Sequence, residues 1–313
     1  MPEPILPIRL VALDIDGTLV GDDLAIGSDT RAAIRAARAR GVFVSLITGR
    51  MVSSALRFAR ELELDTPLVG YQGALIRAMP AEGSTRPGKL LIHTPMPAAV
   101  AREVIVWART HGLEPHVNHL ERFIVHTDDP RADEYTTFMG TPPRLTDDLV
   151  ESIRHPVTKV MCAGEPPLPT ELAPLARAHF AGRADVTVSH PHFVEFVAPG
   201  VSKGRAIRWL ARRLGIPLGA VLAIGDQWND IEMLAEVGHG TAMPSAPAEV
   251  MDAARYVAPS LAEEGVARMI EALVLASPAS ARRAMERMSQ ISPELRTRLA
   301  ERSRPAPSAA ASR

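Results

Sequence analysis

Residues 8–19 place two carboxylates and a glycine turn directly after a short apolar run. The run spans Ile8–Leu13 and continues as Asp-Ile-Asp-Gly-Thr-Leu, so Asp14 and Asp16 follow it at once. A continuous apolar run of this length is typical of a parallel strand that is buried on both faces. We therefore expect a sheet covered by helices on both sides, with the two carboxylates at the carboxyl end of one strand.

Strand and helix patterns alternate through the first part of the chain. Apolar spacing and capping residues predict helices at 30–40 and 52–61, and solid apolar runs predict strands at 42–47 and 67–70. This βαβαβ order implies a parallel sheet with right-handed crossovers. The expected fold class is therefore α/β.

The alternation stops at about residue 79 and resumes after about residue 191. Between these points turn residues are frequent, with half-buried strands expected at 121–126 and 157–161 and an amphipathic helix at 97–111. We interpret this stretch as an α+β domain inserted into the first. The predicted division is core at 1–79 and 192–276, inserted domain at 80–191, and a basic, partly disordered tail at 277–313.

The chain after the insertion returns to the parallel pattern. It predicts a helix at 203–214, a strand at 221–224 and a helix at 230–237. The tail that follows holds eight Arg against three Glu, with no Lys or Asp. Two short amphipathic helices are expected in the tail, with disorder over 304–313, and solvated disorder is favoured over docking on an acidic surface.

Composition excludes several classes of function. The formal net charge is −1 and aromatic residues make up 4% of the chain, so neither a nucleic acid nor an anionic membrane is an expected partner. Cys162 is the only cysteine, which excludes an intramolecular disulfide and a cysteine-based metal cluster. The start lacks a secretory signal, and no apolar stretch reaches about 18 residues. We expect a cytoplasmic protein.

The carboxylates of Asp14 and Asp16 suit a hard divalent cation. Adjacent carboxylates repel each other, and Mg²⁺ with oxygen ligands relieves that repulsion. A carboxylate held against phosphorus by the cation is a competent nucleophile, and the second carboxylate can protonate the leaving oxygen and later activate water. The alternative is a capped strand-to-loop turn, in which Asp and Gly are common.

Two further fragments offer contacts for phosphate. Thr48 and Gly49 stand between a predicted strand and helix, where a hydroxyl and free backbone N–H groups bind phosphate oxygens. Lys203 starts a predicted helix, and its charge can offset that of phosphate and of a nucleophile. Each has a plain alternative, because Thr-Gly is common at strand ends and a Lys beside a turn is usually solvated.

A fourth fragment follows the predicted strand at 221–224. Asp226 supplies a further carboxylate for the cation, Asp230 an outer-shell or direct contact, and Asn229 a contact to phosphate or Lys203. The alternative is that Asn229 and Asp230 cap the next helix. Because ligands of open α/β sheets bind at the carboxyl ends of the strands, we expect all four fragments to converge at one edge.

The order, spacing and strand-end position of the four fragments together resemble the haloacid dehalogenase-like hydrolase superfamily. The large insertion and the Gly-Asp-x-x-Asn-Asp form at residues 225–230 resemble its Cof-type phosphatase branch. The resemblance covers about residues 8–275. It implies a Rossmann-like parallel-sheet core, an inserted cap over the site, Mg²⁺ dependence and hydrolysis of phosphomonoesters.

The resemblance also implies a role for each matching residue. By position, Asp14 is the nucleophile and Asp16 the general acid/base. The implied Mg²⁺ ligands are Asp14, the backbone carbonyl of Asp16, and Asp226. The implied phosphate-binding residues are Thr48, Gly49, Lys203 and Asn229.

Two positions depart from the pattern of that branch. Gln72 stands where the branch usually has the Asn of Asn-Gly-Ala, and Ser245 stands where it often has the Asn of Gly-Asn-Ala. Both positions edge the site, so differences are expected in substrate contacts and cap closure rather than in the reaction. The tail from about residue 277 has no counterpart.

Four histidines form two close pairs, His116 with His119 and His190 with His192. Neither pair has a Cys or an obvious carboxylate partner at the spacing of metal ligands. We expect surface or substrate-facing histidines rather than a zinc site.

The expected function is hydrolysis of a small phosphorylated metabolite (a sugar phosphate, nucleotide or cofactor phosphate) through an aspartyl-phosphate intermediate. A phosphotransferase or phosphomutase on the same scaffold is an alternative that the core residues do not separate from it. A non-catalytic metabolite-binding regulator is the other alternative, and the intact Asp14, Asp16, Lys203 and Asp226 argue against it. Specificity is expected to come from the insertion, and a monomer and a homodimer are both compatible with the sequence.

Overall fold

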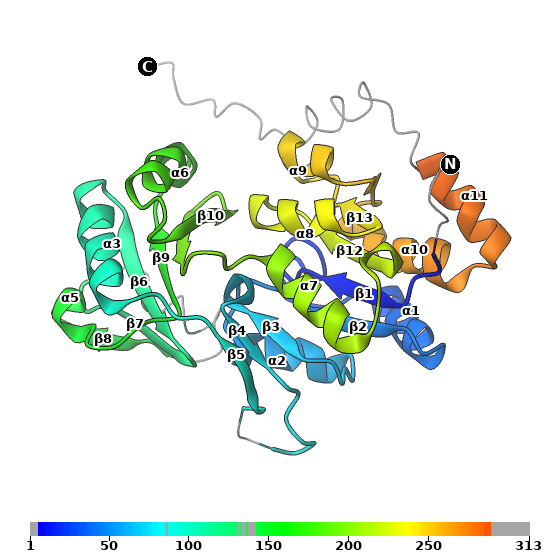
Figure 1. Ribbon diagram of the computed structural model, residues 1–313, viewed down its shortest axis with the longest axis horizontal. Helices are drawn as coiled ribbons and strands as arrows, with labels where there is room; N and C mark the ends of the chain where they lie inside the picture. Colours follow the sequence, from blue (N-terminus) through cyan, green and yellow to red (C-terminus); the bar gives the residue numbers. More distant parts are fainter. Residues whose placement is uncertain (1–5, 85–86, 130–131, 133–135, 137–141, 289–313) are drawn as a thin grey trace.

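The central sheet of this protein is parallel and five-stranded. The computed structural model describes residues 6–84, 87–129, 132, 136 and 142–288. The sheet has the order β14-β13-β12-β1-β2, and every neighbouring pair is parallel. Its strands are β1 (Leu10–Leu13), β2 (Phe43–Leu46), β12 (Val221–Gly225), β13 (His239–Ala242) and β14 (Tyr256–Val257). The predicted α/β fold with a parallel sheet is confirmed (Figure 1).

Helices cover both faces of this sheet, as the solid apolar runs predict. Along β1, Val11 and Leu13 belong to one core, while Leu10 and Ala12 belong to the other. The first core includes α1 (Ser28–Ala39), α2 (Val52–Glu61) and α10 (Gly265–Ile270). The second includes α7 (Lys203–Leu214), α8 (Ile231–Glu236) and α9 (Ala248–Ala253). A side chain the size of leucine that is fully buried in either core contributes about 2 kcal/mol.

After β2 and α2 the chain forms a small antiparallel sheet. Its strands are β3 (Leu68–Gly70), β4 (Leu75–Arg77) and β5 (Leu90–His93). A single parallel bridge between Ile47 and Val69 joins β3 to the end of β2. The predicted start of the insertion at residue 80 is therefore too early, because β5 returns to pair with β4 beside the central sheet.

A second, six-stranded sheet carries the order β10-β11-β9-β6-β7-β8. We call this sheet and its helices the cap (Figure 1). Its strands are β6 (Glu114–His119), β7 (Arg122–His126), β8 (Arg144–Thr146), β9 (Lys159–Ala163), β10 (Asp185–His190) and β11 (Phe193–Val197). Its helices are α3 (Ala98–Thr110), α5 (Leu149–Ser152) and α6 (Leu168–His179).

Strand β11 corrects the predicted end of the insertion. The predicted second core segment begins at residue 192 and so includes 193–197. Instead β11 pairs antiparallel with β10 and β9, so the cap sheet extends to Val197. The α+β character of the insertion follows from its mainly antiparallel pairing.

The cap sheet has one apolar face and one face toward the central sheet. Val160 and Phe196 belong to the buried core on the side of α3 and α6. Lys159, Met161 and Glu195 alternate with these residues and line a cavity on the opposite face. Because successive side chains of a strand point to opposite faces, β9 and β11 each place one set of side chains in the core and the other set at the cavity.

The segment after residue 277 is only partly a tail. Helix α11 (Pro278–Met288) packs Ala281, Ala284 and Met285 into the first core. Spacing of three and four residues gives this helix the apolar face that attaches it. One of the two predicted helices is thus present, and the predicted second helix and disorder at 304–313 lie outside the described residues. Among the described residues, no helix is long and apolar enough to cross a membrane.

Candidate active site

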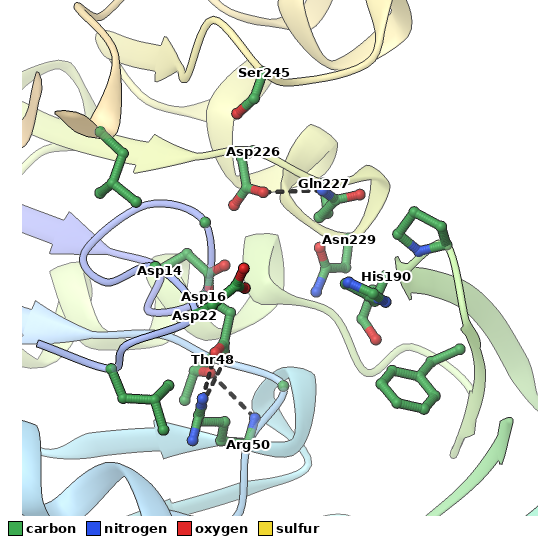
Figure 2. A pocket seen from close by; sticks show the side chains of 18 of the residues that line it. Asp14, Asp16, Asp22, Thr48, Arg50, His190, Asp226, Gln227, Asn229 and Ser245 are labelled. Atoms are coloured by element: carbon green, nitrogen blue, oxygen red, sulfur yellow. Dashed lines mark hydrogen bonds and ion pairs between the residues drawn. The ribbon is translucent and has the colours of Figure 1, made fainter. Parts of the chain in front are cut away.

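A cavity of about 1060 Å³ lies between the carboxyl ends of the central strands and the cap. From β1 the chain continues to β2 on one side, and from β12 it continues to β13 and β14 on the other. The strand order therefore reverses between β1 and β12, which is where an open α/β sheet forms its crevice. From the central sheet the lining residues include Asp14, Asp16, Thr48, Gly49, Asp226 and Asn229. From the cap they include Lys159, Met161, Ser189, His190, Phe193 and Glu195. Figure 2 shows His190 of the cap on the opposite side of the cavity from Asp14 and Asp16.

Lys203 links the first and fourth sequence fragments. Its side chain is fully buried, and Nζ lies 2.8 Å from Asp14 Oδ1 and 2.7 Å from Asp230 Oδ1. Helix α7 begins at this lysine, because the hydroxyl of the N-cap Ser202 accepts a hydrogen bond from the Arg205 N–H. The solvated surface lysine that we weighed as an alternative is therefore wrong.

Asp230 is held in place by contacts from the protein itself. Its Oδ2 accepts hydrogen bonds from the backbone N–H groups of Asp226 (3.0 Å) and Gln227 (3.1 Å), and its Oδ1 accepts one from Lys203. Both oxygens therefore have partners from the chain itself. This geometry suits a residue that positions Lys203 and the Asp226 turn. The Asp230 side chain caps the short 3₁₀ helix Trp228–Asp230, whereas α8, the next helix, has no side-chain cap hydrogen bond from it.

Asp226 is fixed by contacts from three sides. Its Oδ1 accepts from the Thr18 hydroxyl at 2.9 Å and its Oδ2 from the Gln227 amide at 2.9 Å. Gly17 lies against it with φ +76°, and a Cβ there would collide with the Asp226 carboxylate. The glycine after Asp16 is thus required both for the turn and for this approach.

Two buried carboxylates of the site, Asp14 and Asp226, have raised pKa values in the absence of a cation. Burial, together with the neighbouring Asp230, raises the pKa of Asp226 to about 7. Burial also raises the pKa of Asp14 well above its ordinary value, although Lys203 opposes this. Burial alone would lower the pKa of Lys203, but Asp14 and Asp230 raise it above its ordinary value.

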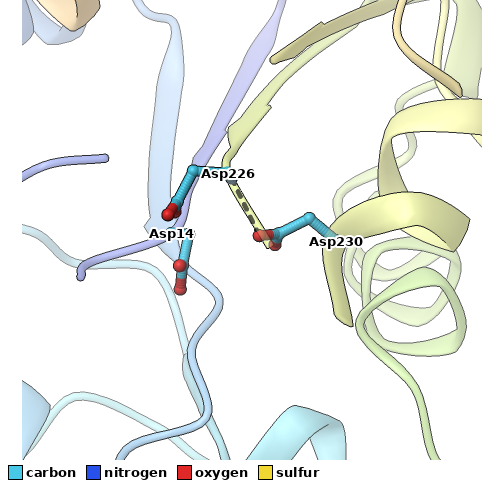
Figure 3. A group of neighbouring side chains, drawn as sticks. All are labelled: Asp14, Asp226 and Asp230. Carbon is cyan, nitrogen blue, oxygen red and sulfur yellow. Dashed lines mark hydrogen bonds between the residues drawn. The ribbon is translucent and has the colours of Figure 1, made fainter. Parts of the chain in front are cut away.

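Asp14, Asp226 and Asp230 form the acidic cluster of the site. Each contributes a carboxylate oxygen, and these oxygens lie within 4.8 Å of one another (Figure 3). Three buried carboxylates beside one ammonium leave negative charge that a hard divalent cation would balance, and all donors are oxygens. The residues therefore fit Mg²⁺. Asp230 accepts hydrogen bonds from two backbone N–H groups and from Lys203, more than Asp226 accepts, so Asp14 and Asp226 are the better candidates.

The side chain of Asp16 lies outside this cluster. Arg50, which is itself buried, holds it in a two-pronged ion pair, with Nε 2.7 Å from Oδ2 and a second contact from Nη2 to Oδ1. The Asp16 side chain is 41% exposed toward the cavity. Arg50 also contacts the Ser54 hydroxyl. The carboxylate is thus held at the cavity wall, beside the cluster (Figure 2).

The turn after β2 presents Thr48 and Gly49 to the cavity. The Thr48 hydroxyl oxygen accepts a hydrogen bond from the Arg50 N–H at 3.1 Å. Asn229 faces this turn from the fourth fragment, and its Nδ2 donates to Gln72 Oε1 at 3.0 Å. Gln72 and Ser245, the two departures from the Cof-type pattern, lie at the site as expected, and Ser245 lines the cavity.

Sequence reasoning missed several polar residues of the site: Thr18, Arg50, Lys159, Glu195 and Gln227. A signal for Lys159 was present. The chain has 35 Lys and Arg residues, of which only Lys89, Lys159 and Lys203 are lysines. Arginine is the usual basic residue of this chain, so a lysine within an apolar strand such as Lys159 is a distinctive feature. In the structure Lys159 and Lys203 are both buried.

The histidine pairs divide between cavity and core. His190 stacks on His192 with ring centroids 5.3 Å apart, and His190 lines the cavity. His116 is buried and lies 2.9 Å from Asp129, so the expected exposure is wrong there and a carboxylate partner exists. Among the described residues no histidine belongs to a cluster with the geometry of a metal site.

A sequence model of the haloacid dehalogenase-like hydrolases matches residues 11–270. The chain belongs to this family. The match covers both halves of the central sheet and the cap between them, so the expected family and fold are confirmed together.

Relatives of this hydrolase include named phosphatases. The HMP-PP phosphatase of Serratia proteamaculans is 33% identical over 248 residues, covering 76% of this chain and 84% of the relative. The 5-amino-6-(5-phospho-D-ribitylamino)uracil phosphatase of Bacillus subtilis is 27% identical over 270 residues, covering 84% and 96%. A haloacid dehalogenase-like hydrolase from Bacteroides thetaiotaomicron has a TM-score of 0.71 at 26% identity, covering 84% and 98%. The expected enzyme class, a phosphatase, is confirmed at this level.

Proposed function

We propose that this hydrolase is a Mg²⁺-dependent phosphatase that releases inorganic phosphate from a small phosphorylated metabolite by way of a phosphoryl group carried on Asp14. The observation that carries the proposal is the contact of a fully buried Lys203 with the Asp14 carboxylate, inside an acidic cluster at the cavity floor. The ammonium group of Lys203 opposes the effect of burial on the pKa of Asp14 and so favours the ionised carboxylate that a nucleophile requires.

The proposed reaction has two steps. A carboxylate oxygen of Asp14 attacks phosphorus and the bond from phosphorus to the ester oxygen breaks. Asp16, which enters this step as the carboxylic acid, gives that oxygen its proton and becomes the carboxylate. Asp16 then takes a proton from water, the water oxygen attacks phosphorus, and the bond to Asp14 breaks to release phosphate. Mg²⁺, held by Asp14, Asp226 and the backbone carbonyl of Asp16, would supply charge neutralisation for the phosphate oxygens.

The remaining residues of the turn and the fourth fragment would bind the phosphate. Thr48 offers its hydroxyl, Gly49 its backbone, and Asn229 an amide that faces the same space. Lys203 would offset negative charge as the phosphoryl group moves. These assignments account for every polar fragment that the sequence pattern singled out.

We further propose that the leaving group carries a planar ring. The cap side of the cavity presents Met161, His190 and Phe193, and the rings of His190 and Phe193 lie 5.5 Å apart. Such a wall suits an aromatic heterocycle better than a bare sugar. The uracil named in the Bacillus subtilis relative supports the same choice.

The test is release of inorganic phosphate from a panel of phosphomonoesters, with Mg²⁺ and with a chelator. We expect turnover that requires Mg²⁺, and a lower KM for phosphates of heterocycles than for plain sugar phosphates. No release from any compound would contradict the phosphatase. Transfer to an added sugar hydroxyl in preference to water would contradict hydrolysis and favour a phosphotransferase.

Asp16→Asn is expected to separate the two steps. With para-nitrophenyl phosphate, whose leaving group needs little protonation, the variant should release about one equivalent of nitrophenol and then turn over about 10² to 10⁴ times more slowly. The reason is that the second step still needs a base for water. Rapid-quench kinetics would measure this, and steady turnover at the wild-type rate would refute the role of Asp16.

Binding of Mg²⁺ is expected to weaken as the pH falls below about 7. The pKa of Asp226 is about 7 in the folded, metal-free protein, so at lower pH the cation must displace a proton and its affinity should fall about tenfold per pH unit. Because this pKa is raised above its unfolded value, the metal-free protein should lose stability as the pH rises toward 7.

Thermal unfolding with and without Mg²⁺ measures both effects. The stabilisation by Mg²⁺ should be clearly larger at about pH 8 than at about pH 5.5, where the carboxyl groups hold protons. Equal stabilisation at the two pH values would rule out a cation site on these carboxylates.

A further inference from the structure

The cap carries a buried ion pair on the face that lines the active-site cavity. Lys159 on β9 and Glu195 on β11 are 3% and 2% exposed, and Lys159 Nζ lies 2.9 Å from Glu195 Oε1. The Ser189 hydroxyl on β10 donates to the same oxygen at 2.7 Å. The pair therefore belongs to three neighbouring strands of the cap sheet, and nothing in the proposed reaction yet uses it.

Both members of the pair also contact the central part of the molecule. Lys159 Nζ donates a hydrogen bond to the Gly49 carbonyl oxygen at 2.9 Å. Glu195 Oε2 accepts one from Gln72 Nε2 at 2.8 Å, and Gln72 Oε1 accepts one from Asn229 at 3.0 Å. The two paths end on Gly49 and Asn229, which are residues proposed to bind phosphate.

The contact to Gly49 orients the Thr48 hydroxyl. In a trans peptide the carbonyl oxygen and the next N–H point in opposite directions. When Lys159 holds the Gly49 carbonyl toward the cap, the Arg50 N–H points back to Thr48 Oγ1, at 3.1 Å. That oxygen then accepts from the backbone, and the hydroxyl hydrogen is left to donate to a ligand in the cavity.

Gln72 is the residue that links Glu195 to Asn229 by hydrogen bonds. It has φ +60° and ψ +15°, a left-handed conformation that is uncommon for glutamine, and it is buried. Its amide packs where a side chain on residue 49 would be, because a Cβ on Gly49 would collide with Nε2. The close packing of Gly49 against Gln72 thus places the hydrogen bonds of the second path beside the turn that contains Thr48 and Gly49.

We propose that Lys159 and Glu195 are positioning residues for phosphate binding. When the cap lies against the central sheet, this pair orients the Gly49 peptide and the Asn229 amide. The phosphate site is therefore complete only when the cap is in place. The inference rests on the proposed function, since it concerns the same phosphate. It adds two residues of the cap to a site otherwise built from the central sheet.

Stability and affinity must be separated to test this role. Lys159→Met leaves Glu195 buried without its cation and should lower the melting temperature as well as the affinity for phosphate. Lys159→Met combined with Glu195→Gln removes both charges, a change that is usually close to neutral for stability. The double variant still lacks the donor to Gly49.

The probe is inorganic phosphate, titrated calorimetrically into the full-length protein with Mg²⁺. We expect the single and the double variant both to bind it about tenfold or more weakly than the wild type, and only the double variant to regain the wild-type melting temperature. The control is Arg183→Met, which breaks an exposed ion pair with Glu103 within the cap and should leave phosphate affinity unchanged.

Two outcomes would overturn the inference. One is a phosphate affinity that recovers together with stability in the double variant, which would mark the pair as structural. The other is a Lys159→Met variant that binds phosphate like the wild type. Because the readout is binding, either result leaves the proposed phosphatase standing if the wild type still hydrolyses the panel, whereas absent hydrolysis would refute that function separately.

Discussion

Asp14→Asn is expected to lower kcat for any phosphomonoester by about 10⁴ or more, because an amide cannot attack phosphorus. The loss should be found for good and poor leaving groups alike, since without the nucleophile neither kind of ester can transfer its phosphoryl group to the protein. Steady-state phosphate release with Mg²⁺ measures it. The substitution removes one negative charge beside Lys203 without changing the size of the side chain, so the fold should be retained.

A matched substitution gives the control for Asp14→Asn. Asp65 is exposed and does not line the cavity, so Asp65→Asn makes the same chemical change elsewhere. We expect wild-type turnover from it. Substantial turnover by a correctly folded Asp14→Asn protein would contradict the assignment of Asp14 as the nucleophile.

Lys203→Met is expected to damage stability and activity together. It leaves the Asp14 and Asp230 carboxylates buried without the cation between them, which costs about 3 to 5 kcal/mol. In a protein of this size such a loss corresponds to a fall of roughly 10 °C in melting temperature. Loss of the charge should also lower kcat/KM by about 10² to 10³.

Lys89→Met is the control for Lys203→Met. Lys89 is exposed near β5, so its substitution should change neither the melting temperature nor kcat/KM measurably. Thermal unfolding in the absence of Mg²⁺ isolates the stability effect from metal binding. A Lys203→Met protein with wild-type stability would mean that the carboxylates do not depend on this lysine.

The central sheet was predictable because its signals are local. The solid apolar runs of β1 and β12 predict strands buried on both faces, and the residue after each run reaches the same edge of a parallel sheet. Asp14 and Asp226 follow from this rule, and Lys203 follows from its place at a helix start. These residues meet although they lie far apart in the sequence.

The cap contacts were not predictable, because antiparallel pairing between distant strands leaves little local trace. The run Phe-Val-Glu-Phe-Val in β11 suggests a buried strand, but the partners of Glu195 lie 36 residues away at Lys159 and 123 residues away at Gln72. The same holds for the pairing of Asp16 with Arg50, 34 residues apart. A buried charge within an apolar run is the feature that would have flagged Glu195.

The most direct test of the account is to find the phosphoryl group on the protein. The Asp16→Asn variant, mixed with substrate and Mg²⁺ and quenched in acid, should carry one phosphoryl group per chain, located by peptide mass spectrometry on Asp14. The combined Asp14→Asn and Asp16→Asn variant should carry none. A phosphoryl group on another residue, or wild-type turnover with no label at all in Asp16→Asn, would contradict the account.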